Sequence, residues 1–417
     1  MYKVIVAHPY QQHSYRTAIG LERKGMLFKY ITTIYQKPFT ITHFLSFLLP
    51  KKYRSRAKRR SNPEIPKNKV LVFNELLSLF RLLCQNIKFL NKYHDRIRYK
   101  LADRFAKKVA KYAIKLKVDA VITYDDCSPL LFEILKKRAP QIKRILDVSA
   151  ANRLYMKLIY ENDFLKAPDY KEKLKNECKQ CFDEELLARI RRELLLSDYY
   201  LCPSFFVKKS LLFCNFIEEK QIKICPYGSD KSIFYPKKDY KYSFPLQFVY
   251  VGGFKALKGV FYMLEAFKSF TSSECVLTFV GNYEPNNPLL SQYKNVRFTG
   301  LVSPEEVSNI LRNSDVFIMP SLGEGLSLSC IEAASCGLPV VASENSGYSD
   351  FILDGQNGFV FPIQNIERLE GIIRWFVNNP DKIQEIGVKS KETADLLSWD
   401  NYYLKLTSII TDIITKL

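Results

Sequence analysis

Two glutamates flank a short stretch of small residues in GEGLSLSCIEAASCGLPVVAS, residues 323–343. Glu324 and Glu332 are eight positions apart, so on one helix they would be separated by about 12 Å along its axis. The two carboxylates of a glycoside hydrolase face each other at about 5 to 9.5 Å. This pair therefore fits neither hydrolase geometry, and its spacing favours contacts with the two ends of one long ligand.

A nucleoside-diphosphate sugar has the length and the chemistry that such a pair requires. Its sugar and its ribose both carry hydroxyls, which a carboxylate can bind. The diphosphate between them is favoured at the N-terminus of a helix, where free amides and the helix dipole stabilise negative charge.

A second stretch, VGGFKALKGV at 251–260, has residues that suit a phosphate. Gly252 and Gly253 follow a predicted strand, and Lys258 stands at the start of a helical segment. Glycines allow the backbone to approach a phosphate closely, and a lysine supplies a compact positive charge. A tight strand-to-helix turn is the alternative interpretation of the glycine pair.

The length and composition of the chain indicate a globular protein with two domains. Its 417 residues are enough for two cores of ordinary size, and 47% of them are apolar. Its ten cysteines are scattered, as is typical of a reducing compartment. The single close pair, Cys178 and Cys181, is weak evidence for zinc, and a structural role is favoured. No signal peptide or spanning segment is evident, so a cytoplasmic location is expected.

The net charge of +20 is concentrated in one part of the chain. Residues 1–120 contain 27 Lys and Arg against 6 Asp and Glu. The densest run, KKYRSRAKRR at 51–60, directly follows the apolar FLSFLLP at 44–50. An apolar segment beside cations is typical of an anionic bilayer surface, which is the favoured interpretation of residues 44–60. A solvated basic loop is the alternative, and nucleic acid is disfavoured because no recognition motif accompanies the charge.

Short apolar runs alternate with helical stretches along the whole chain, as in a doubly wound α/β protein. The helical stretches include 71–118 and 183–196. The predicted strands of the first half are YKVIVA, AVITY, RILDVS, YYLCPS and IKICPYG, and those of the second half are QFVYVGG, CVLTFVG, VRFTG, DVFIMPS, LPVVAS and GFVFP.

A turn-rich stretch at 227–247 separates these two series and predicts the domain junction. The predicted domains are 1–236 for the acceptor, 237–395 for the nucleotide sugar, and a final helix, 396–417, that packs back on the first domain. Two doubly wound domains would face each other across a cleft, with ligands beyond the carboxyl ends of the strands.

The motifs PYGSD, VGGFKALKG and SDVFIMPSLGEGLSLSCIEAASCGLPVVASENSG occur in this order. With them the chain resembles the family-4 retaining glycosyltransferases (glycosyl transferases group 1), which have the two-domain GT-B fold. The resemblance is strongest over 198–400. It implies an α/β protein with two Rossmann-like domains that uses a nucleotide sugar and needs no metal or other cofactor.

The resemblance implies a role for each matching position. Glu324 would contact the donor sugar, Glu332 the ribose and Lys258 the phosphates. Gly325, Leu326 and Ser327 would present backbone amides to the diphosphate, beside Gly252 and Gly253, while Asn282 and Leu301 would lie at the base. His13, in the loop after the first strand, would face the same cleft, so the predicted catalytic residues are Glu324, Lys258 and His13.

The chain departs from the family pattern at two places. Gly253 stands where relatives commonly have an arginine, and an ammonium from Lys255 would lack the bidentate fork of a guanidinium. No histidine occurs in DVSAANRLY at 147–155, where many relatives carry one. Asp125 and Asp126 follow a strand, and we interpret them as caps of the helix SPLLFEILKK rather than as part of the acceptor cleft.

The predicted function is that of a hexosyltransferase-type glycosyltransferase (EC 2.4) that retains the configuration of the sugar. Its acceptor would be a glycan or a lipid-linked hydroxyl in cell-surface polysaccharide or glycolipid synthesis, at the inner face of the membrane. A catalytically degenerate protein that only binds nucleotide sugars or glycans is the alternative. A hydrolase or phosphorylase is a further rival.

Overall fold

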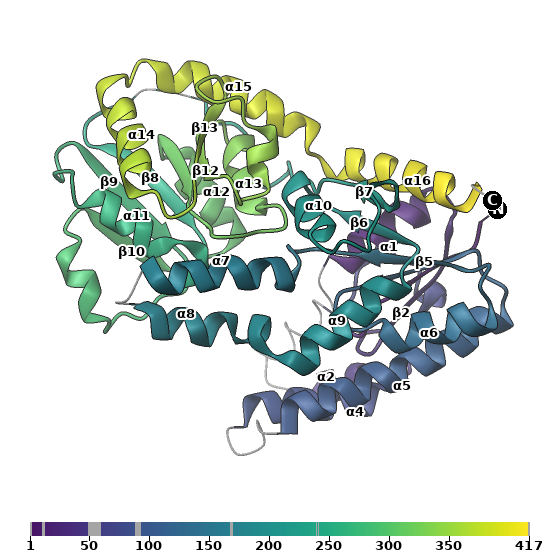
Figure 1. Cartoon of the computed structure of the whole chain (residues 1–417). Helices are drawn as coiled ribbons and strands as arrows, with labels where there is room; N and C mark the ends of the chain where they lie inside the picture. The colour runs from purple at the N-terminus through teal and green to yellow at the C-terminus, as the bar shows by residue number, and fades with distance from the viewer. Residues whose placement is uncertain are drawn as a thin grey trace.

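The computed structural model of the chain describes residues 2–10, 13–48, 60–87, 93–166, 170–238, 240 and 242–415. Figure 1 shows two lobes joined by helices. Each lobe is built on one parallel sheet, with the strand order β3-β2-β1-β4-β5-β6-β7 in the first and β10-β9-β8-β11-β12-β13 in the second. The predicted fold class, two doubly wound α/β domains, is confirmed.

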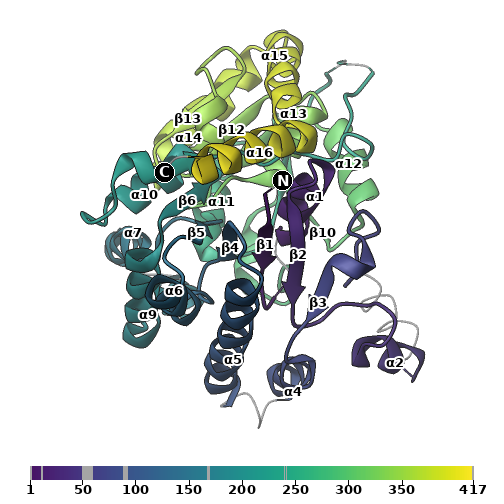
Figure 2. The same ribbon diagram turned by 90° about the vertical axis from the view of Figure 1, so that its right-hand side faces the viewer.

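The first sheet contains seven strands, and helices cover both of its faces (Figure 2). The strands are β1 (Val4–Ala7), β2 (Leu27–Thr32), β3 (Val70–Val72), β4 (Ala120–Tyr124), β5 (Lys143–Asp147), β6 (Tyr199–Cys202) and β7 (Ile222–Ile224). The helices are α1 (Ser14–Arg23), α2 (Ile41–Leu48), α4 (Glu75–Asn86), α5 (His94–Lys115), α6 (Pro129–Arg138), α7 (Arg153–Lys166), α8 (Lys171–Cys178), α9 (Glu184–Leu196) and α10 (Phe205–Leu212).

The second sheet contains six strands. They are β8 (Leu246–Val251), β9 (Cys275–Val280), β10 (Val296–Gly300), β11 (Val316–Met319), β12 (Val340–Ser343) and β13 (Gly358–Phe361). The helices of this half are α11 (Val260–Phe267), α12 (Pro304–Arg312), α13 (Leu328–Ser335), α14 (Ile366–Asn378), α15 (Lys382–Leu396) and α16 (Trp399–Thr415).

The central strands are continuous apolar runs because parallel sheets are covered on both faces. Every residue of VIVA in β1, AVITY in β4 and VFIM in β11 is buried. All ten cysteines are buried and free, as expected of thiols that act as small apolar residues.

The predicted helical stretch 71–118 is wrong at its start and in its continuity. Val70–Val72 forms strand β3, which pairs in parallel with β2, and two separate helices, α4 and α5, follow it. The apolar run continues from β3 into α4, so periodicity alone could not separate the strand from the helix. Strand β2 was missed as well, because Lys29 interrupts its apolar residues.

Two helical connections join the lobes. Helix α16 returns to α1, where the hydroxyl of Tyr402 lies 3.0 Å from Oγ1 of Thr17 and Arg16 donates to the hydroxyl of Tyr403 at 3.1 Å. Helices α7 and α8 reach from the first lobe beneath the second (Figure 1), and the ring of Tyr170 stacks on Phe261 at 4.2 Å.

No helix in the described part of the chain is long and apolar enough to cross a membrane. Most of the predicted basic run, residues 49–59, lies outside the described residues.

Candidate functional site

The motif residues of the second lobe gather at the carboxyl ends of β8 and β11. These two strands are neighbours in the sheet, and the chain leaves them in opposite directions, toward β9 and toward β12. Ligands of open α/β sheets bind at such a switch point. The loop after β8 carries Gly252, Gly253 and Lys258, and the loop after β11 carries Glu324 and leads into α13.

Lys258 and Glu324 form an ion pair between Nζ and Oε1. Ser321 donates from Oγ to the same carboxylate oxygen at 2.8 Å. Gly259, with φ +66°, makes the pair possible because a Cβ there would stand 1.9 Å from the carbonyl oxygen of Pro320. The two loops can approach only because this residue has no side chain, so an ammonium and a carboxylate are held side by side at the switch point.

Glu332 lies on α13, eight residues after Glu324, and its side-chain carboxylate forms no hydrogen bond or ion pair with any residue that the structure describes. Burial raises the pKa of its carboxyl group to about 7. A carboxylate held on a helix without a side-chain partner is chemically suited to accept hydrogen bonds from ligand hydroxyls.

We expect the raised pKa of Glu332 to make the free energy of unfolding depend on pH. In the unfolded chain its pKa is about 4.5, so between pH 4.5 and 7 the folded state binds more protons and stability falls as pH rises. Relative to Glu332→Gln, the wild-type free energy of unfolding should drop by up to about 3 kcal/mol across this window. Urea denaturation of both proteins at pH 5, 6, 7 and 8 measures it. A constant difference would contradict the assignment.

Of the three residues after Glu324, Gly325 connects the lobes, while Leu326 and Ser327 are held within the protein. Gly325 accepts a hydrogen bond from Oγ of Ser204, of the first lobe, at 2.5 Å. Leu326 is buried. The amide of Ser327 donates to the carbonyl oxygen of Ser346 at 3.1 Å, so in this state that amide is already bonded within the protein.

The remaining predicted donor contacts lie at neighbouring strand ends. The amide of Gly252 donates to Val280 at 2.9 Å, and the carbonyl of Gly253 accepts from the hydroxyl of Tyr250 at 3.1 Å. Asn282 follows β9 and is exposed, and its backbone carbonyl accepts from the amide of Phe254. Leu301 follows β10 and is 80% exposed, so its side chain is open to a ligand.

His13 approaches from the first lobe, at the residue before α1. Its Nε2 lies 2.9 Å from Oδ2 of Asp147, at the end of β5, and its ring contacts Tyr124 and Tyr227. A carboxylate only accepts, so Nε2 carries the proton in this bond. Asp147 fixes the orientation of the ring, as a positioning residue would.

Sequence reasoning missed Ser321 and Asp147 as partners of predicted site residues. Both carried a local signal, because each stands at or just beyond the carboxyl end of a predicted strand. Their partners, Glu324 and His13, could not be assigned from that signal.

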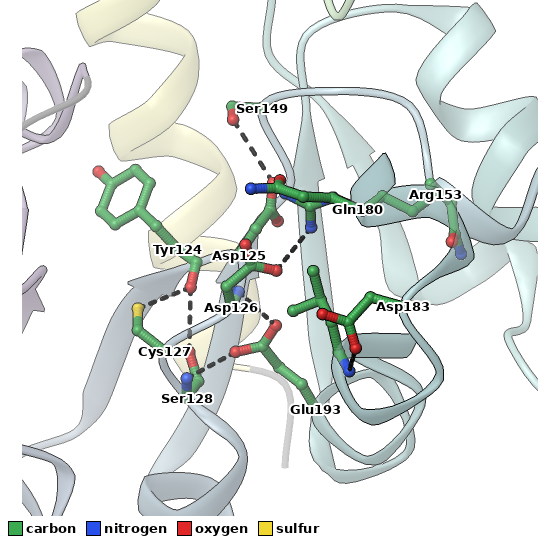
Figure 3. Close-up of polar contacts among 12 residues, drawn as sticks. Tyr124, Asp125, Asp126, Cys127, Ser128, Ser149, Arg153, Gln180, Asp183 and Glu193 are labelled. Atoms are coloured by element: carbon green, nitrogen blue, oxygen red, sulfur yellow. Dashed lines mark hydrogen bonds and ion pairs between the residues drawn. The ribbon is translucent and has the colours of Figure 1, made fainter. Parts of the chain in front are cut away.

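The interpretation of Asp125 and Asp126 as helix caps is wrong. The N-cap of α6 is Ser128, and no side chain caps it. Glu193, from α9, accepts from the amides of Asp126 and Ser128 at 3.0 and 2.6 Å (Figure 3). The backbone amides of this turn therefore donate to a carboxylate that is distant in sequence. The side chain of Asp126 instead forms an ion pair with Arg153 at 2.6 Å.

The lobes touch closely at Gly325. A Cβ at this position would lie 1.8 Å from the carbonyl oxygen of Ser149, in the first lobe, whereas one at Gly323 would meet the flexible end of Met156. We expect Gly325→Ala to hold the lobes apart and Gly323→Ala to be tolerated, because only the first collides with backbone. Small-angle X-ray scattering measures the radius of gyration, and equal values for the two variants would contradict this.

The family profile described as glycosyl transferases group 1 matches residues 234–393, which include every predicted site residue except His13. An uncharacterized glycosyltransferase of Methanocaldococcus jannaschii is 24% identical over 219 residues, 52% of this chain and 60% of that protein. Sulfoquinovosyl transferase of Arabidopsis thaliana is 28% identical over 220 residues, 49% of this chain and 42% of that protein. The chain thus spans about half the length of the curated relatives it matches.

Solved structures match over both lobes. Sucrose-phosphate synthase of Thermosynechococcus elongatus superimposes with a TM-score of 0.66 at 16% identity, covering 100% of both chains. HepE of Anabaena in complex with UDP-glucose gives 0.62 at 12% identity, covering 99% of this chain and 100% of that one. At these identities the likeness concerns the fold, and it confirms the predicted GT-B architecture.

Proposed function

We propose that this protein, which is related to the group 1 glycosyltransferases, transfers a sugar from a nucleoside-diphosphate sugar to an acceptor hydroxyl. The observation that carries the proposal is the arrangement around α13. Glu324 is ion-paired with Lys258 just before the helix, and Glu332 stands on it without a partner among the described residues. The first pair suits a sugar beside a phosphate, and the second carboxylate suits a ribose.

Each group has a distinct part in this reaction. Lys258 neutralises charge on the leaving diphosphate, together with the amides at the start of α13. Glu324 accepts from hydroxyls of the donor sugar and orients it. Glu332 binds the ribose, while Asn282 and Leu301 border the base.

We further propose that the sugar keeps its anomeric configuration and that the transfer needs no metal. The acceptor oxygen attacks the anomeric carbon from the side on which the diphosphate leaves. The bond from that carbon to the diphosphate breaks, its electron pair stays with the diphosphate, and a phosphate oxygen takes the proton of the acceptor hydroxyl. We assign His13 the role of orienting the acceptor.

The similar proteins support this class of donor and product. HepE was crystallised with UDP-glucose. A sulfoquinovosyl transferase is among the relatives, and a galactosyltransferase acting on a diphosphoundecaprenol-linked sugar is another. A role for this chain in glycolipid or polysaccharide synthesis, as a hexosyltransferase of family 4, is consistent with these names.

Thermal melting of the purified chain with UDP, GDP, ADP or CMP, in the presence of a chelator, tests the donor site. A diphosphate at about 100 times its dissociation constant stabilises the native state by roughly 2.7 kcal/mol. We expect one of them to raise the melting temperature selectively, and the rise to be lost in Glu332→Ala but kept in Glu392→Gln, an exposed glutamate of α15. No rise with any of them would remove the proposal.

An assay of nucleoside-diphosphate release separates the proposed enzyme from a protein that only binds. A protein that only binds nucleotide sugars would show the shift but would release no nucleoside diphosphate from the matching donor when a lipid extract is supplied as acceptor. Release that depends on the extract establishes transfer. Release that depends on inorganic phosphate would indicate a phosphorylase instead.

We also propose that α2 lies on an anionic membrane surface at the inner face of the cell membrane. Phe44 and Phe47 are 62% and 63% exposed, on a helix that precedes the basic run at 51–60. Apolar rings can enter the interface while cations meet anionic headgroups.

Co-sedimentation with vesicles checks the membrane proposal. We expect binding to vesicles that contain phosphatidylglycerol. Binding should be weaker in Phe44→Ser/Phe47→Ser, because the two rings that would enter the membrane interface are lost. The matched control is Phe205→Ser, an exposed ring of α10 on another part of the first lobe. Equal binding to neutral and anionic vesicles would contradict the electrostatic part.

A further inference from the structure

A cavity of about 380 Å³ opens at the switch point of the first sheet. Strands β1 and β4 are neighbours there, and the chain leaves them toward opposite edges of the sheet. Pro9 and Tyr10 follow β1, and Asp125 and Asp126 follow β4. Helices α4 and α5 form the opposite wall. By the rule that places ligands of open α/β sheets, this is the position at which the first lobe would bind one.

Three arginines converge on this cavity. Arg60 precedes β3, Arg81 lies on α4 and Arg98 on α5. None of the three forms an ion pair within the described part of the chain. Cations brought together in this way repel one another, and the repulsion is relieved when an anion binds between them.

Arg81 is the most strongly constrained of the three. Its guanidinium lies 4.8 Å from the centre of the Tyr10 ring, and Nη1 is 3.2 Å from Nε2 of His94. Its Nε is buried without a hydrogen-bond partner in the described structure. Burial, followed by the nearby Arg60 and Arg98, lowers the pKa of Arg81. The guanidinium is therefore held in place with donor capacity that the protein does not use.

The two acidic residues of the cavity do not neutralise these arginines. Asp126 is paired with Arg153 at 2.6 Å (Figure 3). Burial, with the nearby Asp126 and Glu193, raises the pKa of Asp125 well above its usual range. Three arginines thus face a single carboxyl group, Asp125, that is not engaged in an ion pair in the described structure, so the cavity remains positive.

We propose that this cavity binds a phosphate or diphosphate group carried by the acceptor. Guanidinium forks match phosphate oxygens in pairs, and three of them around one cavity suit a group with several anionic oxygens. The three arginines converge on one point. Neutralising a nucleic-acid backbone would instead require cations spread along a long surface. The identification of the ligand as the acceptor rests on the proposed transferase function.

The position of Asp125 connects this site to the donor site. Asp125 also lines a second cavity, of about 180 Å³, whose wall includes Gly323 of the second lobe. Gly323 is the residue before Glu324. An acceptor whose phosphate is held by the arginines can therefore extend past Asp125 toward the sugar.

Isothermal titration with inorganic pyrophosphate tests the anion site on the full chain. UDP is added in excess, so that the proposed donor site is occupied. We expect one binding site, weakened about 10- to 100-fold in Arg81→Gln and in Arg98→Gln, because each loses charge-assisted hydrogen bonds. Arg104→Gln, an exposed arginine on the same helix as Arg98, is the matched control and should bind as the wild type does.

A second arm distinguishes a lipid headgroup from a soluble phosphate. Phosphatidylcholine vesicles with and without phosphatidic acid are sedimented with the wild type, Arg98→Gln and Arg104→Gln. A loss of binding specific to Arg98→Gln would show that the cavity takes the phosphate of a lipid. Vesicle binding that is equal in all three, with pyrophosphate binding lost in Arg98→Gln, would show a soluble phosphate.

Two results would overturn the proposal. One is pyrophosphate binding that is unchanged in both arginine variants, with melting curves that show them to be folded. The other is a wild type that binds neither pyrophosphate nor phosphatidic acid. Failure of the donor hypothesis gives a different pattern, in which no nucleoside diphosphate stabilises the protein while pyrophosphate binding still depends on Arg98.

Discussion

Glu324→Gln is expected to lower the rate of sugar transfer by about 100- to 1,000-fold. The carboxylate accepts from Ser321 at 2.8 Å and is ion-paired with Lys258. The amide keeps the shape but removes the charge, so it can no longer hold both the lysine and the sugar hydroxyls in the arrangement that the transition state needs. Release of nucleoside diphosphate in the presence of the acceptor extract measures the rate.

The control for this variant is Glu392→Gln, which makes the same change of charge on an exposed face of α15 and should leave the rate unchanged. Nucleotide affinity separates the causes of a loss. Because Glu324 is placed on the sugar and not on the nucleotide, stabilisation by the diphosphate should survive in Glu324→Gln. A wild-type rate of transfer in Glu324→Gln would contradict the proposed role of Glu324.

Lys258→Met should reduce both transfer and diphosphate binding, with a loss of transfer of about 100- to 1,000-fold. The structure places the ammonium against Glu324, and in the proposed reaction it meets the charge that develops on the leaving phosphate. Methionine keeps most of the length and the apolar stem of the side chain. The thermal shift with the diphosphate and the transfer rate are measured together.

Lys294→Met is the matched control, because Lys294 is exposed and lies in the same lobe. Lys258→Met also leaves Glu324 without its cation in a partly buried place, so a lower melting temperature without ligand is expected. A Lys258→Met protein that melts lower but keeps full transfer would show that the pair is structural. In that case another group, with Lys255 the nearest candidate in sequence, would have to carry the phosphate.

The two lysines show what a departure from a family pattern means physically. Gly253 has no guanidinium to offer at the position where relatives commonly have an arginine. Lys255 is exposed, whereas Lys258 is ion-paired with Glu324. The proposed phosphate role therefore falls to Lys258, which the 3₁₀ turn Ala256–Lys258 positions beside Glu324. The turn ends at Gly259, which adopts a left-handed conformation with φ +66°.

The sequence by itself determined the strands of both sheets except β2 and β3, and the local grouping of Glu324 with Glu332. The domain junction at 227–247 stays a prediction. These features are local: buried parallel strands are continuous apolar runs, and glycines and small residues mark the turns that follow them. Strand β3 was not predicted because its three apolar residues are continuous in sequence with the apolar residues of α4. Its pairing with β2 is a contact between distant segments.

Only the tertiary structure decided which loops meet. Lys258 and Glu324 are 66 positions apart, and His13 and Asp147 are 134 apart. The arginine cavity combines residues that follow β1 and β4 with residues of α4 and α5, and the Asp125–Asp126 turn is satisfied by Glu193 instead of capping α6. Nothing in a local pattern encodes such convergence, because it follows from strand order and domain packing, which bring the carboxyl ends of distant strands to one edge.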